Sequence, residues 1–354
     1  LVQQIINLNN DSIVQGVADI SPLSKLTNFH ATTSLPNDLM HDFNEGLCSR
    51  VLLAMIKEAS SKRILAYGEI EERLIAFEYG PNDKPNKGPV LRKKHLNKGK
   101  IIGTASQKIC LFKLFPIIFH DIIDVLDTKE IYVCLREIIS LVYACPFRKS
   151  WLPYLHSLTI RFQCLIVHML PNLMIPKVHF ISHYAKQIEM YGPSIRHWCM
   201  RFEAKHQMFK QLAVKSNNFK NILYTLSKRH QLRQCLLLSL PDYCTMIREG
   251  YSATEKHIYT LPADVRKLLQ GKIAHFDDTT TVMEYQRLKF DHVMFIKGSV
   301  FVTNLVEEEE IPSFLHVIFI LKIATDWLLI VEQLETVAFN ESLWEYKLEH
   351  KHLL

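Results

Sequence analysis

Two carboxylates, Asp38 and Glu203, stand where the sequence could support metal-dependent chemistry. Asp38 directly follows a stretch with strand propensity, residues 28–34, and Glu203 lies inside a predicted helix. Cleavage of a phosphodiester commonly uses carboxylates that hold two Mg²⁺ ions, one activating the nucleophile and one stabilising the leaving oxygen. Mg²⁺ prefers oxygen ligands, so a carboxylate at a strand end that faces one on a helix is a workable pair.

Helical spacing places Cys199, His206 and Lys210 on the same face as Glu203. Cations beside a carboxylate keep it ionised, and they could equally neutralise a phosphate. A single Glu among basic residues is also the ordinary composition of a solvated, salt-bridged helix face. Spacing alone therefore leaves both interpretations open.

A basic run with interleaved aromatic residues extends from Lys205 to Arg233. Its candidate DNA-contacting residues are Lys205, His206, Lys210, Lys220, Lys228 and Arg229. Basic helices can bind the phosphate backbone, and such binding is salt-sensitive and independent of base sequence. A solvated face is the competing interpretation. The basic, proline-containing stretch 80–103 has the same two interpretations, a solvated loop or a loop that contacts DNA.

The His and Cys residues show no strong metal-binding pattern. Eight Cys are present without a C-x-x-C pair, which argues against a zinc ribbon or finger and favours reduced, buried thiols. His179 and His183 are four residues apart and could share a helix face, but no third zinc ligand is indicated beside them. Packing or DNA contact is the favoured role of this pair, and packing is favoured for Cys199.

Apolar spacing predicts the helices that would position these residues. A helix is expected from about Asp42, which could cap it, to Ser60, and further helices over 127–142 and 151–170. Another is expected over 195–213. Its predicted buried side consists of Trp198, Phe202, Phe209 and Leu212.

The C-terminal part has a different pattern. From about residue 282, β-branched and aromatic residues alternate with turn signals, which predicts strands within 292–303, 315–323 and 327–334. The acidic run 307–310 is expected to be an exposed turn between strands.

Composition bounds the class of protein. The 354 residues are 48% hydrophobic, so a large core can be buried and global disorder is not expected. The formal net charge of +6 suits a polyanionic partner without identifying one. The most apolar late stretch carries His316, Lys322 and Asp326, so no membrane span is expected. The chain begins at Leu1 without a signal-peptide pattern, and we expect a natural N-terminus upstream.

An ordered set of motifs resembles the transposases of the CACTA (En/Spm-like) group, and most closely the uncharacterised animal proteins derived from such elements. The first motif is an Asp-x-Met-His … Glu-Gly pattern within Leu35–Gly46. The others are Gly103–Gln107, Cys110–Pro116, Pro176–Tyr184, Tyr191–Pro193, Trp198–His206, Phe219–Ile222 and Arg229–Gln231. The set covers nearly the whole chain, and Trp198–His206 is its most specific member.

The resemblance implies an α/β fold. Its RNase H-like core would occupy residues 1–255, N-terminally incomplete and interrupted by a large helical insertion at about 60–175. A small β-rich C-terminal module would follow at 256–354.

The resemblance also implies an Asp-Asp-Glu triad, in which Asp38 is the second Asp and Glu203 is the final Glu. Both would bind Mg²⁺ or Mn²⁺, so we expect the two side chains to approach each other in the fold. Asp42 is the fallback for Asp38. His41 and Arg201 would be signature positions, and the role of His41, metal-site support or packing, stays open.

The implied activity is metal-dependent DNA cleavage and strand transfer in the nucleus. The implied partner is double-stranded DNA, and the protein could form a homo-oligomer. The family's first Asp lies on a strand well before the Asp-x-Met-His segment. Here Asp11 and Asp19 lie in polar, loop-like surroundings that do not suit that role. We therefore expect this chain alone to be inactive. The alternative is a domesticated or decayed protein that holds DNA or chromatin without catalysis.

Overall fold

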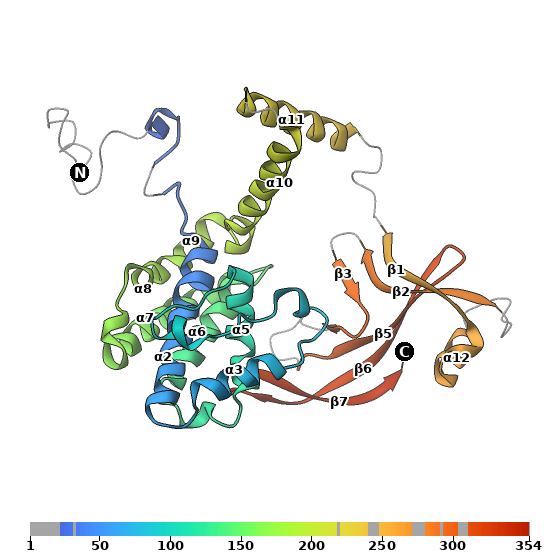
Figure 1. The fold of residues 1–354 in the computed structure, drawn as a ribbon, viewed down its shortest axis with the longest axis horizontal. Coiled ribbons are helices and arrows are strands. Elements are labelled where there is room, and N and C mark those ends of the chain that lie inside the picture. The colour runs from blue at the N-terminus through green and yellow to red at the C-terminus, as the bar shows by residue number, and fades with distance from the viewer. Residues whose placement is uncertain are drawn as a thin grey trace.

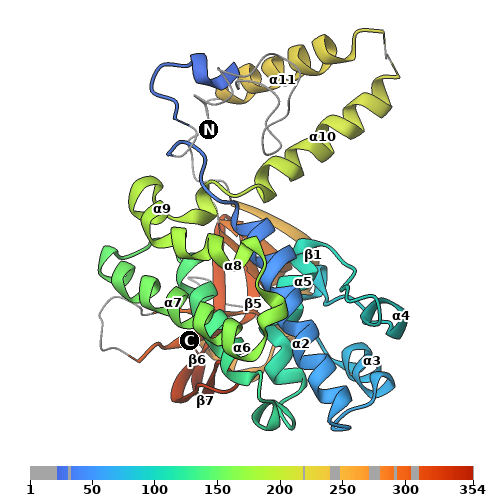
Figure 2. The ribbon, with the colours of Figure 1, turned by 90° about the vertical axis from the view of Figure 1, so that its left-hand side faces the viewer.

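The computed structural model describes residues 22–30, 33–217, 220–239, 248–270, 280–290, 293–303 and 311–353. Three parts follow one another along the chain: a helical body, a hairpin of two helices, and an antiparallel sheet (Figure 1). Figure 2 shows from a second direction that the hairpin extends away from the body. No helix in these ranges combines the length and the apolar character needed to cross a membrane.

The helical body begins with a π-helix, Met40–Leu47, that runs directly into α2, Cys48–Ser61. Its other helices are α3 (Tyr67–Ala76), α4 (Lys93–Leu96), α5 (Ala105–Ile118), α6 (Lys129–Val142), α7 (Leu152–Met169), α8 (Pro176–Phe180) and α9 (Tyr184–Tyr191). The helices expected within 42–60, 127–142 and 151–170 are confirmed. The basic stretch 80–103 is anchored to the body by Leu91 and Leu96, which are both buried.

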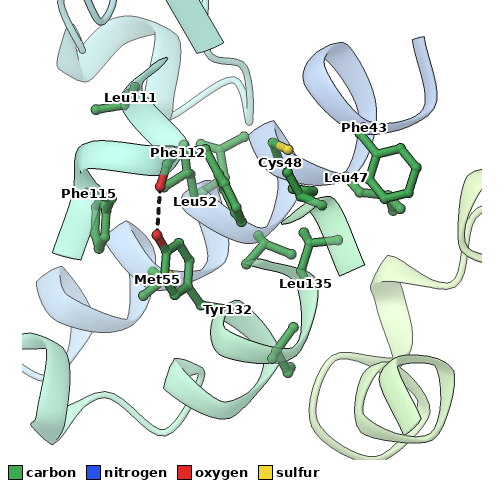
Figure 3. Close-up of a cluster of buried hydrophobic side chains, with 14 of the residues drawn as sticks. Phe43, Leu47, Cys48, Leu52, Met55, Leu111, Phe112, Phe115, Tyr132 and Leu135 are labelled. Atoms are coloured by element: carbon green, nitrogen blue, oxygen red, sulfur yellow. Dashed lines mark hydrogen bonds between the residues drawn. The ribbon is translucent and has the colours of Figure 1, made fainter. Parts of the chain in front are cut away.

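The core of the body lies among α2, α5, α6 and α7. Figure 3 shows Phe112 of α5 packed against Tyr132 of α6, with Leu52 and Met55 of α2 beside them. The Tyr132 hydroxyl donates a hydrogen bond to the Phe112 carbonyl at 2.7 Å, which satisfies its only polar group inside the core. Phe43 is fully buried as well, so the same core also holds the π-helix.

The N-terminus of α6 is capped from α2. The carboxylate of Glu58 accepts hydrogen bonds from the backbone N–H of Asp127 at 2.6 Å and of Thr128 at 3.0 Å. Lys62 forms an ion pair with the same carboxylate at 2.6 Å. Burial raises the pKa of Glu58, but these hydrogen bonds outweigh it and hold the pKa below its ordinary value. The unpaired N–H groups at a helix start favour a negative charge there.

The hairpin consists of α10 (Met200–Ser216) and α11 (Ile222–Ser239). Over these described residues, neither helix contains a buried side chain. The two helices meet along a thin seam. In it the Phe209 ring lies edge-on to His230, with 5.4 Å between ring centroids, and the Arg233 guanidinium donates to the Met208 sulfur.

The helix expected over 195–213 starts later, at Met200, and its predicted buried side is only partly correct. Trp198 packs against the core of the body, and Phe209 and Leu212 are half-buried. Phe202 is 57% exposed, so its predicted burial is wrong. The reason is that α10 leaves the body within its first turns, where no other described element covers Phe202.

The sheet has the strand order β1 (Arg248–His257), β2 (Thr281–Phe290), β5 (Phe314–Ile323), β6 (Asp326–Asn340) and β7 (Glu345–Leu353). Two short strands join it, β3 (Val293–Ile296) beside β2 and β4 (Val300–Val302) beside β5. All of these pairings are antiparallel. The helix α12 (Ala263–Gln270) packs on the sheet through Val265 and Leu269.

The strands expected within 292–303, 315–323 and 327–334 are confirmed. The sheet nevertheless begins at Arg248, before the predicted module boundary at 256, because the polar strand β1 belongs to it. The acidic run 307–310 lies outside the described residues. The turn between β6 and β7 attaches the sheet to the body, where Lys129 donates to the Ser342 hydroxyl at 2.8 Å.

Helices and a sheet are both present, as the α/β prediction requires, but residues 33–217 and 220–239 contain only helices and loops. The strand expected at 28–34 is wrong in its described part. Asn28 has a φ of 67°, and the N–H groups of Thr33 and Ser34 both donate to the His30 carbonyl, at 3.0 and 2.7 Å. Strand propensity reflects packing against neighbouring strands, and the described residues place none beside this segment.

Candidate functional site

Asp38 joins the start of the π-helix to the start of α10. One carboxylate oxygen accepts the backbone N–H of His41 at 3.1 Å, as a helix-capping residue does. The other oxygen accepts the backbone N–H of Cys199 at 2.7 Å. Burial raises the pKa of Asp38, but the hydrogen bonds from Cys199 and His41 outweigh it and leave the pKa below its ordinary value. Asp38 is therefore ionised at neutral pH.

Asp42 has neither of the roles expected for it, the helix cap or the fallback ligand. It is 5% exposed, and its carboxylate accepts the hydroxyl of Tyr184 in α9 at 2.9 Å. Burial raises the pKa of Asp42 although the Tyr184 hydrogen bond lowers it. The helix begins earlier than predicted, so Asp38 takes the capping position and Asp42 turns into the body.

Position 46 requires glycine because the side chain of Lys177 comes very close to the π-helix there. The ammonium of Lys177 in α8 donates to the carbonyl oxygen of His41 at 2.5 Å. A Cβ on Gly46 would lie 2.6 Å from Cδ of Lys177 and 2.9 Å from the His41 oxygen. The Glu-Gly end of the first motif thus has a structural reason, because only glycine leaves room for the lysine at its present position. π-Helical turns are frequently found at functional sites.

His41 brings the two predicted carboxylates together. Its Nδ1 is hydrogen-bonded to Asp38, and its Nε2 lies 3.7 Å from Oε1 of Glu203. Glu203 stands in the first turn of α10, where its backbone N–H donates to the Cys199 carbonyl at 2.8 Å. Asp38 and Glu203 therefore lie on either side of one imidazole ring. A separation of the two carboxylates short enough to bridge two metal ions stays a prediction.

An open pocket of about 960 Å³ lies beside Glu203. The face of α10 predicted from spacing lines it through Cys199, Glu203, His206 and Lys210. His41 lines it as well, and Thr104 and Ser106 from the beginning of α5 are on its wall. The signature position Arg201 is exposed and is not among the lining residues. A polar or anionic group entering this pocket would meet a carboxylate, an imidazole and an ammonium.

The residues predicted to contact DNA are all exposed. They are Lys205, His206 and Lys210 on α10, Lys220 in the connecting turn, and Lys228 and Arg229 on α11. Residues 200–239 contain eight Lys or Arg against one carboxylate, Glu203. The hairpin is therefore a strongly basic projection whose one acidic group lies at its base, at the pocket.

The histidine pair His179 and His183 forms its own contact. The two Nε2 atoms lie 3.1 Å apart, and both side chains are exposed. Burial, with the nearby charge of His179 as the next cause, lowers the pKa of His183. Within the described part of the chain, the one group of three metal-ligating side chains in mutual reach lies elsewhere, so a zinc site at this pair stays without a third ligand.

Cys199 is the candidate site residue that sequence reasoning missed, because it was assigned to packing. Its sulfur, a carboxylate oxygen of Asp38 and a ring nitrogen of His41 all lie within 4.8 Å of one another. Burial and the charge of Asp38 raise the pKa of the thiol. The signal that could have found it was its position one helical turn before Glu203. The predicted burial of the cysteines is correct for Cys48, Cys110 and Cys134 and wrong for Cys145, Cys164 and Cys235, which are exposed.

This arrangement is a poor fit to the Mg²⁺ or Mn²⁺ pair that the resemblance implies. The Glu203 side chain is 61% exposed, and the His41 imidazole stands between it and Asp38. A hard cation prefers oxygen ligands, whereas the neighbouring atoms here are a ring nitrogen and a sulfur. Asp11 and Asp19 lie outside the described residues. No catalytic step through two metal ions is derived from this site.

The chain matches no family model, and neither the curated proteins nor the solved structures contain a match to it.

Proposed function

We propose that this chain is a transposon-derived, DDE transposase-like protein that binds the backbone of double-stranded DNA through the α10–α11 hairpin. The observation that carries the proposal is the charge of the hairpin, eight Lys or Arg against one carboxylate, on two helices without a buried side chain among their described residues. A surface of this kind neutralises phosphates and releases counterions from DNA. Its place of action would be the nucleus.

The position of Glu203 supports the transposase part of the proposal. It lies at the base of the basic hairpin, in the pocket that His206 and Lys210 also line. A phosphate held by those cations would come close to Glu203 and to the His41–Asp38 pair. The RNase H-like core belongs to the same proposal. Its support is the motif resemblance alone, because the described residues between 33 and 239 contain no strand that could belong to the sheet of such a core.

A second candidate function is DNA or chromatin binding without catalysis, as in a domesticated or decayed transposase. Two observations favour it specifically: an imidazole lies between Asp38 and Glu203, and a third carboxylate ligand is not found at the pocket among the described residues. We therefore expect no Mg²⁺- or Mn²⁺-dependent cleavage of duplex DNA by this chain alone.

The test is a salt titration of duplex DNA binding, with fluorescence anisotropy as the readout. The variants Lys210→Glu and Arg229→Glu each reverse one charge on the hairpin. Each should weaken binding at low salt and reduce the slope of log K against log salt by about one to two, because fewer counterions are released. Several duplexes of unrelated sequence should give similar results.

The matched control is Lys57→Glu, which makes the same change of net charge on α2, in the body, where Lys57 is exposed. Control and wild type should bind alike within about a factor of two, the order of effect of one distant screened charge. Equal affinity of wild type and both hairpin variants would show that the hairpin is only a solvated surface. An equal loss in the control would show that net charge, rather than the hairpin, drives binding.

A further inference from the structure

We propose that Asp38, His41 and Cys199 form a three-ligand site for a zinc-like divalent cation, and that Glu203 orients the imidazole of His41. The proposal deepens the proposed function, because it names the metal that suits the same pocket. It differs from the two-metal scheme in one decisive respect: Glu203 is a positioning residue here rather than a ligand.

The ligand atoms are close enough for one ion. The Asp38 oxygen, the His41 nitrogen and the Cys199 sulfur all lie within 4.8 Å of one another. Zinc binds such atoms at about 2.0–2.3 Å in a tetrahedron, which corresponds to about 3.2–3.8 Å between ligand atoms. Small rotations of side chains that are only partly buried would close the remaining gap.

The backbone around the site is held independently of any ion. The Cys199 N–H donates to Asp38 at 2.7 Å, which fixes the thiol-bearing residue beside the carboxylate. Lys177 holds the carbonyl of His41 at 2.5 Å, and Gly46 leaves space for that contact. The three ligand residues are therefore brought together by contacts between the π-helix, α8 and the start of α10.

Glu203 occupies the place of an orienting carboxylate. The Nδ1 side of the His41 ring faces Asp38, and the Nε2 side lies 3.7 Å from Glu203. A histidine that binds a metal through one ring nitrogen usually donates the proton of the other to a carboxylate or carbonyl. With the cation on Nδ1, Glu203 would accept the Nε2 proton of His41 and fix the ring in that tautomer.

The ligand set also selects the class of metal. Thiolate and imidazole favour zinc and related transition metals, whereas Mg²⁺ selects oxygen donors. Three protein ligands leave a fourth position open, as in zinc sites that bind a water or a substrate atom. Cys199 and His41 both line the pocket of His206 and Lys210, so an anionic oxygen, such as that of a phosphate, is the ligand expected at that position.

The experiment titrates the metal-free chain with Co²⁺, which reports on thiolate ligation by a charge-transfer absorption band, and then displaces it with Zn²⁺ or Mg²⁺. We expect the band to form, to disappear with equimolar Zn²⁺ and to survive excess Mg²⁺. Cys199→Ser should abolish the band. The matched control Cys235→Ser removes an exposed thiol on α11 and should leave the band unchanged.

Glu203→Gln is a second variant that should fold like the wild type, because the exposed Glu203 side chain does not pack in the core. It should retain the band and weaken Co²⁺ binding about 10- to 100-fold, the effect typical of removing an orienting carboxylate. Absence of a band in wild type, loss of it in Cys235→Ser, or displacement by Mg²⁺ would overturn the proposal. DNA affinity of the metal-free chain, measured with Lys210→Glu, tests the proposed function separately.

Discussion

The helices α6 and α10 have similar lengths and opposite surroundings. α6 has 14 residues and buries seven of them, whereas α10 has 17 residues and, although all are described, buries none. Both carry apolar residues at helical spacing. The stripe of α6 meets α2 and α7, while that of α10 meets little besides α11 across a thin seam.

The difference shows that the packing of α6 stabilises the fold, whereas the surface of α10 remains available for contact with a partner. Burial of apolar surface contributes about 25 cal/mol per Å², so α6 adds to the stability of the body and α10 adds little. The side chains of α10 and α11 stay in solvent, and most of the charged ones are basic. A helix pair with this composition is suited to a charged partner rather than to a core.

The largest contrast is expected from one substitution made in both regions. Leu135→Ala in α6 removes a fully buried side chain and should cost about 2–5 kcal/mol of unfolding free energy. Leu232→Ala in α11 removes a side chain that is 59% exposed and should cost less than about 0.5 kcal/mol. Urea unfolding measures both. Similar losses at the two positions would mean that the hairpin is packed into the cooperative core.

A smaller effect is expected at the junction of the two regions. Gly46→Ala places a Cβ 2.6 Å from Lys177 and should destabilise by about 1–3 kcal/mol, since the lysine must leave the His41 carbonyl or the π-helix must shift. The matched control is Gly68→Ala in α3, where a Cβ meets nothing within 4 Å. It should stabilise by about 0.5–1 kcal/mol, because alanine has less freedom in the unfolded chain.

Thermal unfolding of both glycine variants gives the comparison directly. A neutral Gly46→Ala variant would show that Lys177 relocates without loss, and the structural reason for the Glu-Gly motif would then be wrong.

The smallest effect concerns pH. Burial raises the pKa of Glu58, but the hydrogen bond from Lys62 and those from the start of α6 outweigh it and hold the pKa below its ordinary value. Its stabilising contribution is therefore complete above its unfolded-state pKa of about 4.3 and is lost as pH falls through the lower folded-state value. Glu58→Gln should cost about 1 kcal/mol at pH 7, the typical value of a helix cap.

The difference between wild type and Glu58→Gln should shrink as the pH falls from 5 to 3 in urea unfolding. The control is Glu72→Gln in α3, where Glu72 is exposed and has no role in capping α6. A difference that stays constant with pH would show that Glu58 contributes through packing rather than through its charge.

Periodic apolar patterns allowed the sequence to predict much of the body and of the sheet. The stripe Ile131, Leu135, Ile138 and Val142 predicted α6, and the run of β-branched and aromatic residues within 315–323 predicted β5. β1 was missed because its residues are polar and exposed, so only its pairing with β2 makes it a strand. The segment 28–34 shows the opposite case, because its residues favour a strand but the described residues place no strand beside it.

The sequence by itself determined the shared face of Glu203, His206 and Lys210 and the basic character of the hairpin, because helical spacing and charge are local properties. Tertiary structure decided that Asp38 holds the N–H of Cys199, that His41 stands between two carboxylates, and that Asp42 turns inward to Tyr184. Each of those contacts joins segments far apart in the chain. Their formation depends on the packing of the body between them, which offsets the entropy lost in closing so long a loop.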